Sequence, residues 1–225
     1  ITTAVTNTTI DDTVNPDVTT ITLTASPDLD EDGGTVTYTA SIPGGITTTQ
    51  AVTVQFDDLL GNTQTITIAA GSVSNTVDVV VAEAEFEDAL AEAAAVYGVS
   101  NVSVTDEGDL EDTTVDSSGA SIEITDTIDT TTVTLDDVTV DEDETITYTA
   151  SVDNTQSASF SVTLNNGVVI NFAANAATGS SAPQAAQGED AVIDTESFAV
   201  NIASAAGSTF EDLDTTTNGS ATVTI

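Results

Sequence analysis

The segment TVTYTAS at residues 35–41 decides the fold class, because it alternates polar and apolar side chains and occurs twice. Its second copy, TITYTAS, spans residues 145–151, 110 positions later in the chain. Threonine on one side and Val, Ile or Tyr on the other give a period of two residues, which is typical of a β-strand with one buried and one solvated face. The sequence therefore predicts the same strand in two homologous units.

Shorter matches extend the repeat on both sides of this strand. TITL at residues 20–23 corresponds to TVTL at residues 132–135. Further on, alternating runs flank Gly61-Asn62 in the first unit and Asn165-Asn166-Gly167 in the second. Asn-Gly between two alternating runs is a strong hairpin signal. The repetition therefore reaches well beyond one strand.

The number and spacing of these strands predict the architecture. About seven short strands per roughly 100 residues, separated by turns, are typical of an immunoglobulin-like β-sandwich. We therefore expect an all-β chain of two tandem immunoglobulin-like β-sandwich domains joined by a short acidic linker. Residues 1–126 form the first domain and residues 127–225 the second, and residues 1–11 resemble the last strand of a preceding repeat.

One segment interrupts the β pattern. Residues 83–97 are rich in alanine and place Phe86, Leu90, Ala94 and Tyr97 at helical spacing. Gly98 follows as a plausible helix stop. The pattern predicts a short helix inserted in the first domain, either as a plain surface insertion or, alternatively, as a helix that binds a partner.

The charge of the chain is one-sided. It has 38 Asp and Glu residues and no Lys, Arg or His, which gives a formal net charge of -38. Such a chain repels itself when compact unless counter-ions bind to it, and Ca²⁺ is the cation that suits oxygen ligands. The same charge disfavours nucleic acid and anionic membrane surfaces as partners. No apolar run is long enough to insert into a membrane.

The residue types exclude most catalytic chemistry. Without His, Lys, Arg or Cys the chain has no Ser-His-Asp triad, no reactive thiolate and no Schiff-base lysine. A carboxylate pair could hydrolyse glycosides, but a sugar cleft needs aromatic platforms, and only 4% of the residues are aromatic. We expect no enzyme and no disulfide, because cysteine is absent.

Three kinds of acidic cluster offer the oxygen ligands that Ca²⁺ prefers. The joints contain Asp12, Asn15, Asp17, Asp126 and Asp129. The acidic turns contain Asp28, Asp30, Asp32, Asp141 and Asp143. The loop clusters contain Asp57, Asp58, Asp106, Glu107, Asp109, Glu111, Asp112, Glu189, Asp190, Glu211 and Asp212. Because loops at one end of a sandwich meet the linker, joint and loop carboxylates could converge on one ion.

Several of these motifs together resemble a known family. TVTL, an acidic turn, TITYTAS, SAAGSTFEDL at residues 204–213 and DTIDTTT at residues 126–132 are similar to the repeats of large RTX-type biofilm adhesins. The resemblance covers essentially the whole chain in two copies. The segment at residues 83–97 departs from the pattern, and the glycine-rich RTX nonapeptide is absent.

The resemblance implies immunoglobulin-like extender domains in a stalk on the surface of a Gram-negative bacterium, exported by a type I system. It implies calcium at the linkers between domains. Asp12-Thr13-Val14-Asn15 lines up with Asp126-Thr127-Ile128-Asp129, so Asp126, Asp129, Asp12 and Asn15 are the ligands that it suggests.

The leading hypothesis is a non-enzymatic, calcium-stiffened stalk of a cell-surface adhesin that supports cell adhesion and biofilm formation. Its expected partners are neighbouring repeats of the same chain, with other copies or surface glycans as further possibilities. A subunit of a self-assembling extracellular filament or surface layer is the alternative, and a carbohydrate-binding or hydrolytic module is a third hypothesis.

Overall fold

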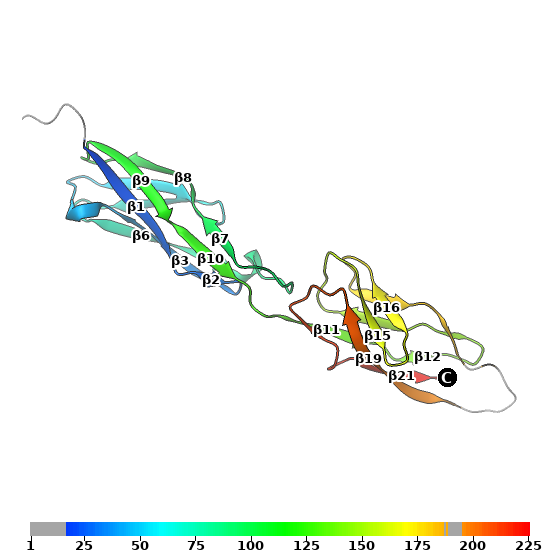
Figure 1. Ribbon diagram of the computed structural model, residues 1–225. Helices are drawn as coiled ribbons and strands as arrows, with labels where there is room; N and C mark the ends of the chain where they lie inside the picture. Colours follow the sequence, from blue (N-terminus) through cyan, green and yellow to red (C-terminus); the bar gives the residue numbers. More distant parts are fainter. Residues whose placement is uncertain (1–16, 187, 189–194) are drawn as a thin grey trace, which may run out of the picture. The chain divides into compact units, whose positions relative to one another are not determined.

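The computed structural model describes residues 17–186, 188 and 195–225, which form two compact all-β units (Figure 1). Unit 1 takes the chain up to Phe86 and then Ala94–Thr125, whereas unit 2 takes Glu87–Ala93 and Asp126–Ile225. The prediction of an all-β, sandwich-like chain is confirmed. Of the candidate calcium ligands, Asp12, Asn15, Glu189 and Asp190 lie outside the described residues.

Unit 1 is built from three small sheets around one core. Their strand orders are β6-β3-β1-β9, β2-β10-β7 and β5-β4-β8. The strands are β1 (Val18–Ser26), β2 (Leu29–Asp30), β3 (Gly33–Ser41), β4 (Val52–Asp57), β5 (Thr63–Ile68), β6 (Ser74–Ala82), β7 (Ala95–Gly98), β8 (Ser100–Asp106), β9 (Asp112–Gly119) and β10 (Ser121–Thr125). Two short 3₁₀ turns, η1 (Pro43–Gly45) and η2 (Glu83–Glu85), complete the unit.

Unit 2 joins most of its strands into one continuous sheet. The order is β12-β21-β19-β15-β16-β17-β14-β11-β20, and β13 pairs separately with β18. The strands are β11 (Thr130–Leu135), β12 (Val138–Thr139), β13 (Thr145–Ile146), β14 (Thr149–Val152), β15 (Phe160–Leu164), β16 (Val169–Phe172), β17 (Thr178–Ser181), β18 (Gln184–Ala185), β19 (Ser197–Ala206), β20 (Asp212–Asp214) and β21 (Ser220–Thr224). The buried faces of these strands share one apolar core.

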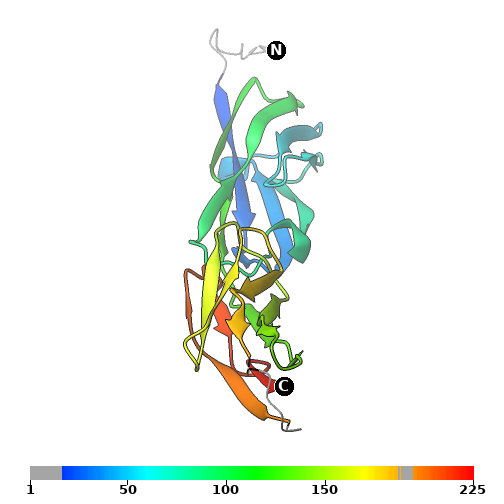
Figure 2. The same ribbon diagram turned by 90° about the vertical axis from the view of Figure 1, so that its right-hand side faces the viewer.

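The first long strand of each unit pairs in the same way. In unit 1, β1 is antiparallel to β3 and parallel to β9, as Figures 1 and 2 show. In unit 2, β11 is antiparallel to β14 and parallel to β20. The parallel ladders pair Val18 with Asp112 and Thr130 with Asp212. These registers define which residues of the two units are equivalent.

The repeated tyrosine anchors each core, from β3 in unit 1 and from between β13 and β14 in unit 2. Tyr38 is 1% and Tyr148 is 2% exposed. The Tyr38 hydroxyl accepts a hydrogen bond from the backbone N–H of Leu59 (3.3 Å), and the Tyr148 hydroxyl accepts one from Asn166 Nδ2 (3.1 Å). Each ring therefore packs in the core while its hydroxyl holds the turn of a hairpin, as expected for a buried amphipathic aromatic.

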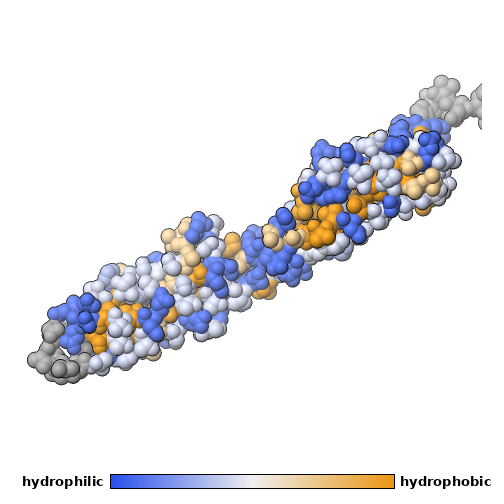
Figure 3. All heavy atoms as spheres, turned by 180° about the vertical axis from the view of Figure 1, so that it is seen from behind, coloured by the Kyte–Doolittle hydropathy of each residue, from blue (hydrophilic) through white to orange (hydrophobic). Residues whose placement is uncertain are grey.

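The outward faces of the strands carry threonine and acidic residues. In Figure 3 the viewed surface is mostly hydrophilic, with apolar stretches on both units. On β3, for example, Thr37 donates a hydrogen bond to Asp78 Oδ1 of β6 (2.7 Å). The alternation therefore places one residue in two in the core and the next in water, as its period predicts.

The predicted helix over residues 83–97 is wrong, since only the turn η2 is helical there. Phe86 packs its ring edge-on to Tyr97 in unit 1, with centroids 4.9 Å apart, whereas Leu90 packs on the core of unit 2. One helical face could not send these side chains to two different cores. Acidic residues such as Asp88 and Glu92 stand four positions apart in this segment. In a helix they would lie next to each other and repel, with no cation to offset their charges.

We predict that Tyr148→Phe lowers the free energy of unfolding of unit 2 by about 1 kcal/mol, because Asn166 loses its acceptor while the ring stays in place. Thermal unfolding followed by near-ultraviolet circular dichroism measures this change. Tyr38→Phe is the matched variant in unit 1, and a loss above about 3 kcal/mol, typical of a core truncation, would contradict the role assigned to the hydroxyl.

Candidate metal centre

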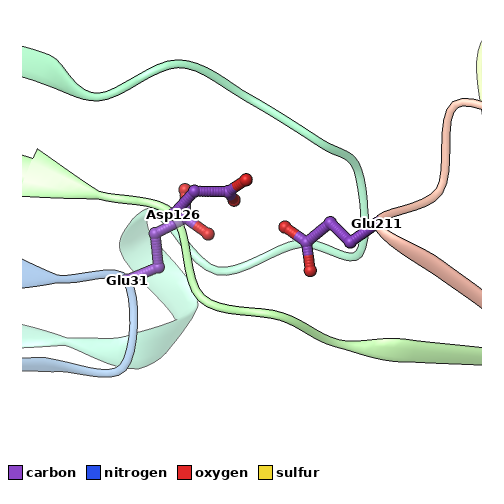
Figure 4. A group of neighbouring side chains, drawn as sticks. All are labelled: Glu31, Asp126 and Glu211. Carbon is purple, nitrogen blue, oxygen red and sulfur yellow. The ribbon is translucent and has the colours of Figure 1, made fainter.

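Two carboxylates meet where the chain enters unit 2. Asp126 follows β10 directly, and Glu211 immediately precedes β20. A carboxylate oxygen of Asp126 lies within 4.8 Å of one of Glu211. Figure 4 draws the side chains of Asp126 and Glu211 as sticks. Two anions this close favour either a shared proton or a bound cation.

Glu211 is the carboxylate whose environment is most unusual. Its Oε1 is shielded from solvent and has no N–H or O–H donor among the described residues. Burial raises the pKa of Glu211, and a hydrogen bond to the Asp126 carboxyl group raises it further. The backbone N–H of Asp129 acts in the opposite direction on this pKa. An oxygen held out of water without a donor is a suitable ligand for a hard cation.

The second oxygen of Glu211 has a defined partner in the linker. Glu211 Oε2 accepts a hydrogen bond from the backbone N–H of Asp129. In unit 1, Glu111 Oε2 accepts one from the backbone N–H of Asp17, at 2.6 Å. Each glutamate stands directly before the strand that pairs in parallel with the first long strand of its unit. The same contact therefore occurs at the entrance to both units.

This equivalence revises how the two joints align. The ladder registers and the glutamate contacts make Asp17 the counterpart of Asp129, the place that the sequence alignment gave to Asn15. Asp17 follows Asp12 by five positions in the sequence, whereas Asp129 follows Asp126 by three, so an alignment without gaps cannot match both pairs. A length difference of this kind is invisible to a match of short, similar motifs.

Unit 2 includes a segment that comes from the middle of the first repeat. Glu87–Ala93 stands in the sequence between β6 and β7, which are both in unit 1, yet it belongs to unit 2. Leu90 forms an antiparallel β-bridge with Phe210 and packs on the same core. Two backbone hydrogen bonds frame this pair, from Ala91 N to Thr209 O (3.1 Å) and from Glu211 N to Ala89 O (3.3 Å).

The same segment also contacts the carboxylate pair. The backbone N–H of Glu92 donates to Asp126 Oδ2 at 3.1 Å. Both carboxylate oxygens of Glu87, Asp126 Oδ1 and Thr127 Oγ1 are shielded from solvent within unit 2. The 87–93 segment thus reaches the pair through the N–H of Glu92, and further solvent-shielded oxygens lie on the segment and on the linker.

The acidic pair Asp57 and Asp58 serves the structure of a hairpin. Asp57 accepts hydrogen bonds from Asn101 Nδ2 (2.6 Å) and Thr63 Oγ1 (2.8 Å), and the first of these is the main reason that its pKa is lowered. Asp58 is 3% exposed. It accepts three hydrogen bonds, from Leu60 N, Asn62 N and Gln64 Nε2. Protein donors therefore stabilise these charges at the turn between β4 and β5.

The structural equivalence of the acidic turns differs from the one that their sequences suggest. Asp28 Oδ1 accepts the backbone N–H of Glu123 (2.8 Å), and Asp137 Oδ1 accepts that of Thr222 (2.6 Å). Asp28 is therefore the counterpart of Asp137, which lies upstream of the Asp141 turn. The remaining candidates of these turns are exposed to solvent, namely Asp30, Asp32, Asp141 and Asp143.

Glu31 is the buried acid of the first turn, with 7% of its surface exposed. Its backbone N–H donates to Thr125 O at 3.1 Å, just before Asp126 in the chain. In unit 2 the equivalent bond runs from Val140 N to Thr224 O, so an apolar residue stands at this position there. Sequence reasoning missed Glu31 and Glu87, because nothing in a run of acids tells which carboxyl groups the fold shields from solvent.

Comparison with models of protein families shows which family the chain belongs to. A model of the LapA domain matches residues 17–127 and again residues 129–225. The chain belongs to the LapA domain family. LapA is a large cell-surface adhesin of biofilms, which links this LapA-type chain to adhesion and to a structural, non-enzymatic role. The two matched ranges correspond to the two copies of the TVTYTAS repeat.

Comparison with curated protein sequences gave no significant match. Within the described parts of this LapA-type chain, no helix has the length and apolarity needed to cross a membrane.

The raised pKa of Glu211 gives unit 2 a characteristic pH response when metal is chelated. A carboxyl group with a higher pKa in the folded state stabilises that state fully below its unfolded pKa of about 4.3 and loses this contribution as the pH rises through the folded value. In EGTA, we expect the melting temperature of unit 2 to rise as the pH falls from 7 towards 5.

Glu211→Gln should flatten this slope, because glutamine keeps an acceptor for Asp129 but does not titrate. Asp57→Asn in unit 1 is the control, since the lowered pKa of Asp57 contributes stability that is lost as the pH falls. Equal slopes for Glu211→Gln and the unmodified chain would contradict the assignment.

Leu90→Asp should destabilise unit 2 selectively, although residue 90 stands within the first repeat of the sequence. We expect a loss of about 1–3 kcal/mol, because the apolar contact with Phe210 is lost and a further carboxylate enters an acidic region. Hydrogen exchange of Val200 and Ile202 amides reports unit 2, and that of Val54 and Phe56 amides reports unit 1. Loss of protection only in unit 1 would show that the segment belongs there.

Proposed function

We propose that the chain is a pair of structural extender repeats in the stalk of a large cell-surface adhesin, stiffened by Ca²⁺ bound at its joints. The observation that carries the proposal is Glu211: a solvent-shielded carboxylate oxygen without a donor, beside Asp126, in a chain that has no side-chain cation. No side-chain cation is present to form a salt bridge with this pair, whereas a divalent cation can neutralise both charges.

The proposed ion is held chiefly by residues of unit 2. Asp126 and Glu211 are the primary ligands, and Thr127 and Glu87 supply further shielded oxygens from the linker and the 87–93 segment. Asp129 contributes its charge close to Glu211. This set matches the preference of Ca²⁺ for several carboxylate and neutral oxygens.

The equivalent joint at the entrance to unit 1 supports a repeating arrangement. Glu111 holds the backbone of Asp17 as Glu211 holds that of Asp129. We propose that the chain upstream of Asp17, with Asp12 and Asn15, completes a second site of the same kind. Ions at successive joints would restrict bending between neighbouring repeats, which is the property that a stalk requires.

The net negative charge of the chain bears both on its export and on its stiffening by Ca²⁺. The proposed route is type I secretion, as the resemblance to RTX-type adhesins suggests. Where Ca²⁺ is scarce, uncompensated repulsion leaves an anionic chain only marginally stable. Outside the cell, Ca²⁺ binding to the folded state adds stability by mass action, about 2.7 kcal/mol at a concentration 100 times the dissociation constant.

A calcium titration followed by thermal unfolding tests the proposal. We expect Ca²⁺ to raise the melting temperature and EGTA to reverse the change, with Mg²⁺ less effective because it prefers a smaller octahedral set of ligands. Asp126→Asn and Glu211→Gln should each weaken Ca²⁺ binding by at least about tenfold, as measured by isothermal calorimetry.

Asp78→Asn is the matched control, because this residue of β6 is an exposed acid bonded to Thr37. It should leave Ca²⁺ affinity at the joint unchanged. The proposal fails if all three variants bind equally well, or if the melting temperature does not respond to Ca²⁺. Small-angle scattering with and without EGTA then shows whether ion binding narrows the distribution of particle lengths.

A further inference from the structure

The loop before β9 in unit 1 corresponds residue by residue to the edge that receives the 87–93 segment in unit 2. The ladder registers match Asp112 with Asp212, so Asp109, Leu110 and Glu111 match Thr209, Phe210 and Glu211. The glutamate of each triplet holds the backbone at the start of its unit in the same way. Unit 2 thus shows what this edge can bind, and unit 1 presents a second example of it.

In unit 2 the edge is occupied. Thr209 O and Glu211 N bond to Ala91 N and Ala89 O, and Leu90 covers Phe210, which is 7% exposed. In unit 1 the counterpart Leu110 is only partly buried, although it packs against the core. The carbonyl of Asp109 and the N–H of Glu111 bond to no other residue in the described part of the chain.

The unit 1 edge is held in a fixed position. The carboxylate of Asp109 accepts hydrogen bonds from the backbone N–H of Thr49, at 2.9 and 3.1 Å, and from Thr49 Oγ1 at 2.9 Å. These bonds, chiefly that from the Thr49 backbone, lower the pKa of Asp109. The edge is therefore ordered before any partner arrives, so docking needs little ordering of the loop itself.

We propose that Asp109–Glu111 is a docking edge for an extended segment of another LapA-type repeat, one with an apolar side chain between two small residues, like Ala89-Leu90-Ala91. Docking adds one antiparallel β-bridge, with the carbonyl of Asp109 and the N–H of Glu111 bonded to the incoming backbone and its central apolar side chain covering Leu110. This is strand addition to an available edge, in which the backbone provides affinity and the side chain provides selectivity.

Small residues at both flanks are part of the recognition. Ala89 and Ala91 bring the two backbones together beside acidic neighbours, where longer side chains would meet the carboxylates of Asp109 and Glu111. Since both surfaces are acidic, binding should strengthen as salt or Ca²⁺ rises. The proposal rests on the equivalence of the two units and does not require the calcium site at Asp126 and Glu211.

The test uses the complete chain with its own 87–93 segment locked in place. The chain has no cysteine, so Leu90→Cys combined with Phe210→Cys introduces a single possible disulfide. Bridge partners of this antiparallel kind have Cα atoms about 4.5 Å apart, within the range that a disulfide spans. A fluorescent peptide with the sequence of residues 85–94, EFEDALAEAA, is then titrated by anisotropy.

We expect the locked chain to bind this peptide, and Leu110→Asp to weaken the binding by at least about tenfold. Val80→Asp is the matched control, because Val80 is 72% exposed on β6, and it should change nothing. A peptide with aspartate in place of its leucine should not bind. In the unlocked, unsubstituted chain, amide shifts on addition of the peptide should include Leu110, Glu111 and Asp112.

The proposal is overturned if the locked chain does not bind at millimolar peptide. It is also overturned if Leu110→Asp binds as well as its parent, or if amide shifts occur only at residues 208–212. The experiment is run in Ca²⁺ and, at matched ionic strength, with the Glu211→Gln variant. Binding that survives in this variant separates the docking edge from the calcium site.

Discussion

The structure depends on how a chain with 38 carboxylates and no side-chain cation keeps its charges apart. Uncharged hydrogen-bond donors stabilise several of these carboxylates. Asp58 caps a hairpin turn, Asp28 and Asp137 hold the backbone of the last strand in each unit, and Asp109 ties two loops together. In each case N–H groups stabilise the anion, which is one way to hold a charge when salt bridges are impossible. Most acids outside these roles lie in water on the threonine-rich faces.

At the joint formed by Asp126 and Glu211, hydrogen-bond donors do not stabilise the carboxylates in the same way. At Asp126 and Glu211 two carboxylates approach each other, and Glu211 Oε1 is shielded from solvent without an N–H donor among the described residues. A folded chain keeps such a pair either by holding a proton, at a cost in stability at neutral pH, or by binding a metal ion. The chain belongs to the LapA domain family, whose namesake is a cell-surface adhesin.

Because of the 87–93 segment, the compact units of this chain do not coincide with its sequence repeats. A boundary drawn by sequence similarity falls in the linker, yet one β-bridge and an apolar contact place residues of the first repeat in the second compact unit. The chain therefore passes from one unit to the other at three points, after Phe86, after Ala93 and after Thr125. Unit 2 depends on a piece of sequence that a domain-by-domain truncation would remove.

Local sequence alone determined the strands, because a two-residue alternation of Thr with Val, Ile or Tyr can bury one face only as a β-strand. It also determined the duplication and the absence of His, Lys, Arg and Cys, since these follow from residue types and their order.

Only the tertiary structure decided which acids meet. Glu31 and Asp30 are neighbours of like charge, and the strand register alone buries the first and exposes the second. Likewise, Phe86 and Leu90 stand at helical spacing, but Phe86 packs on the core of unit 1 and Leu90 on the core of unit 2. This tertiary packing overrides the local preference for a helix. Pairings between residues far apart in the chain determine both results, and a single sequence does not contain them.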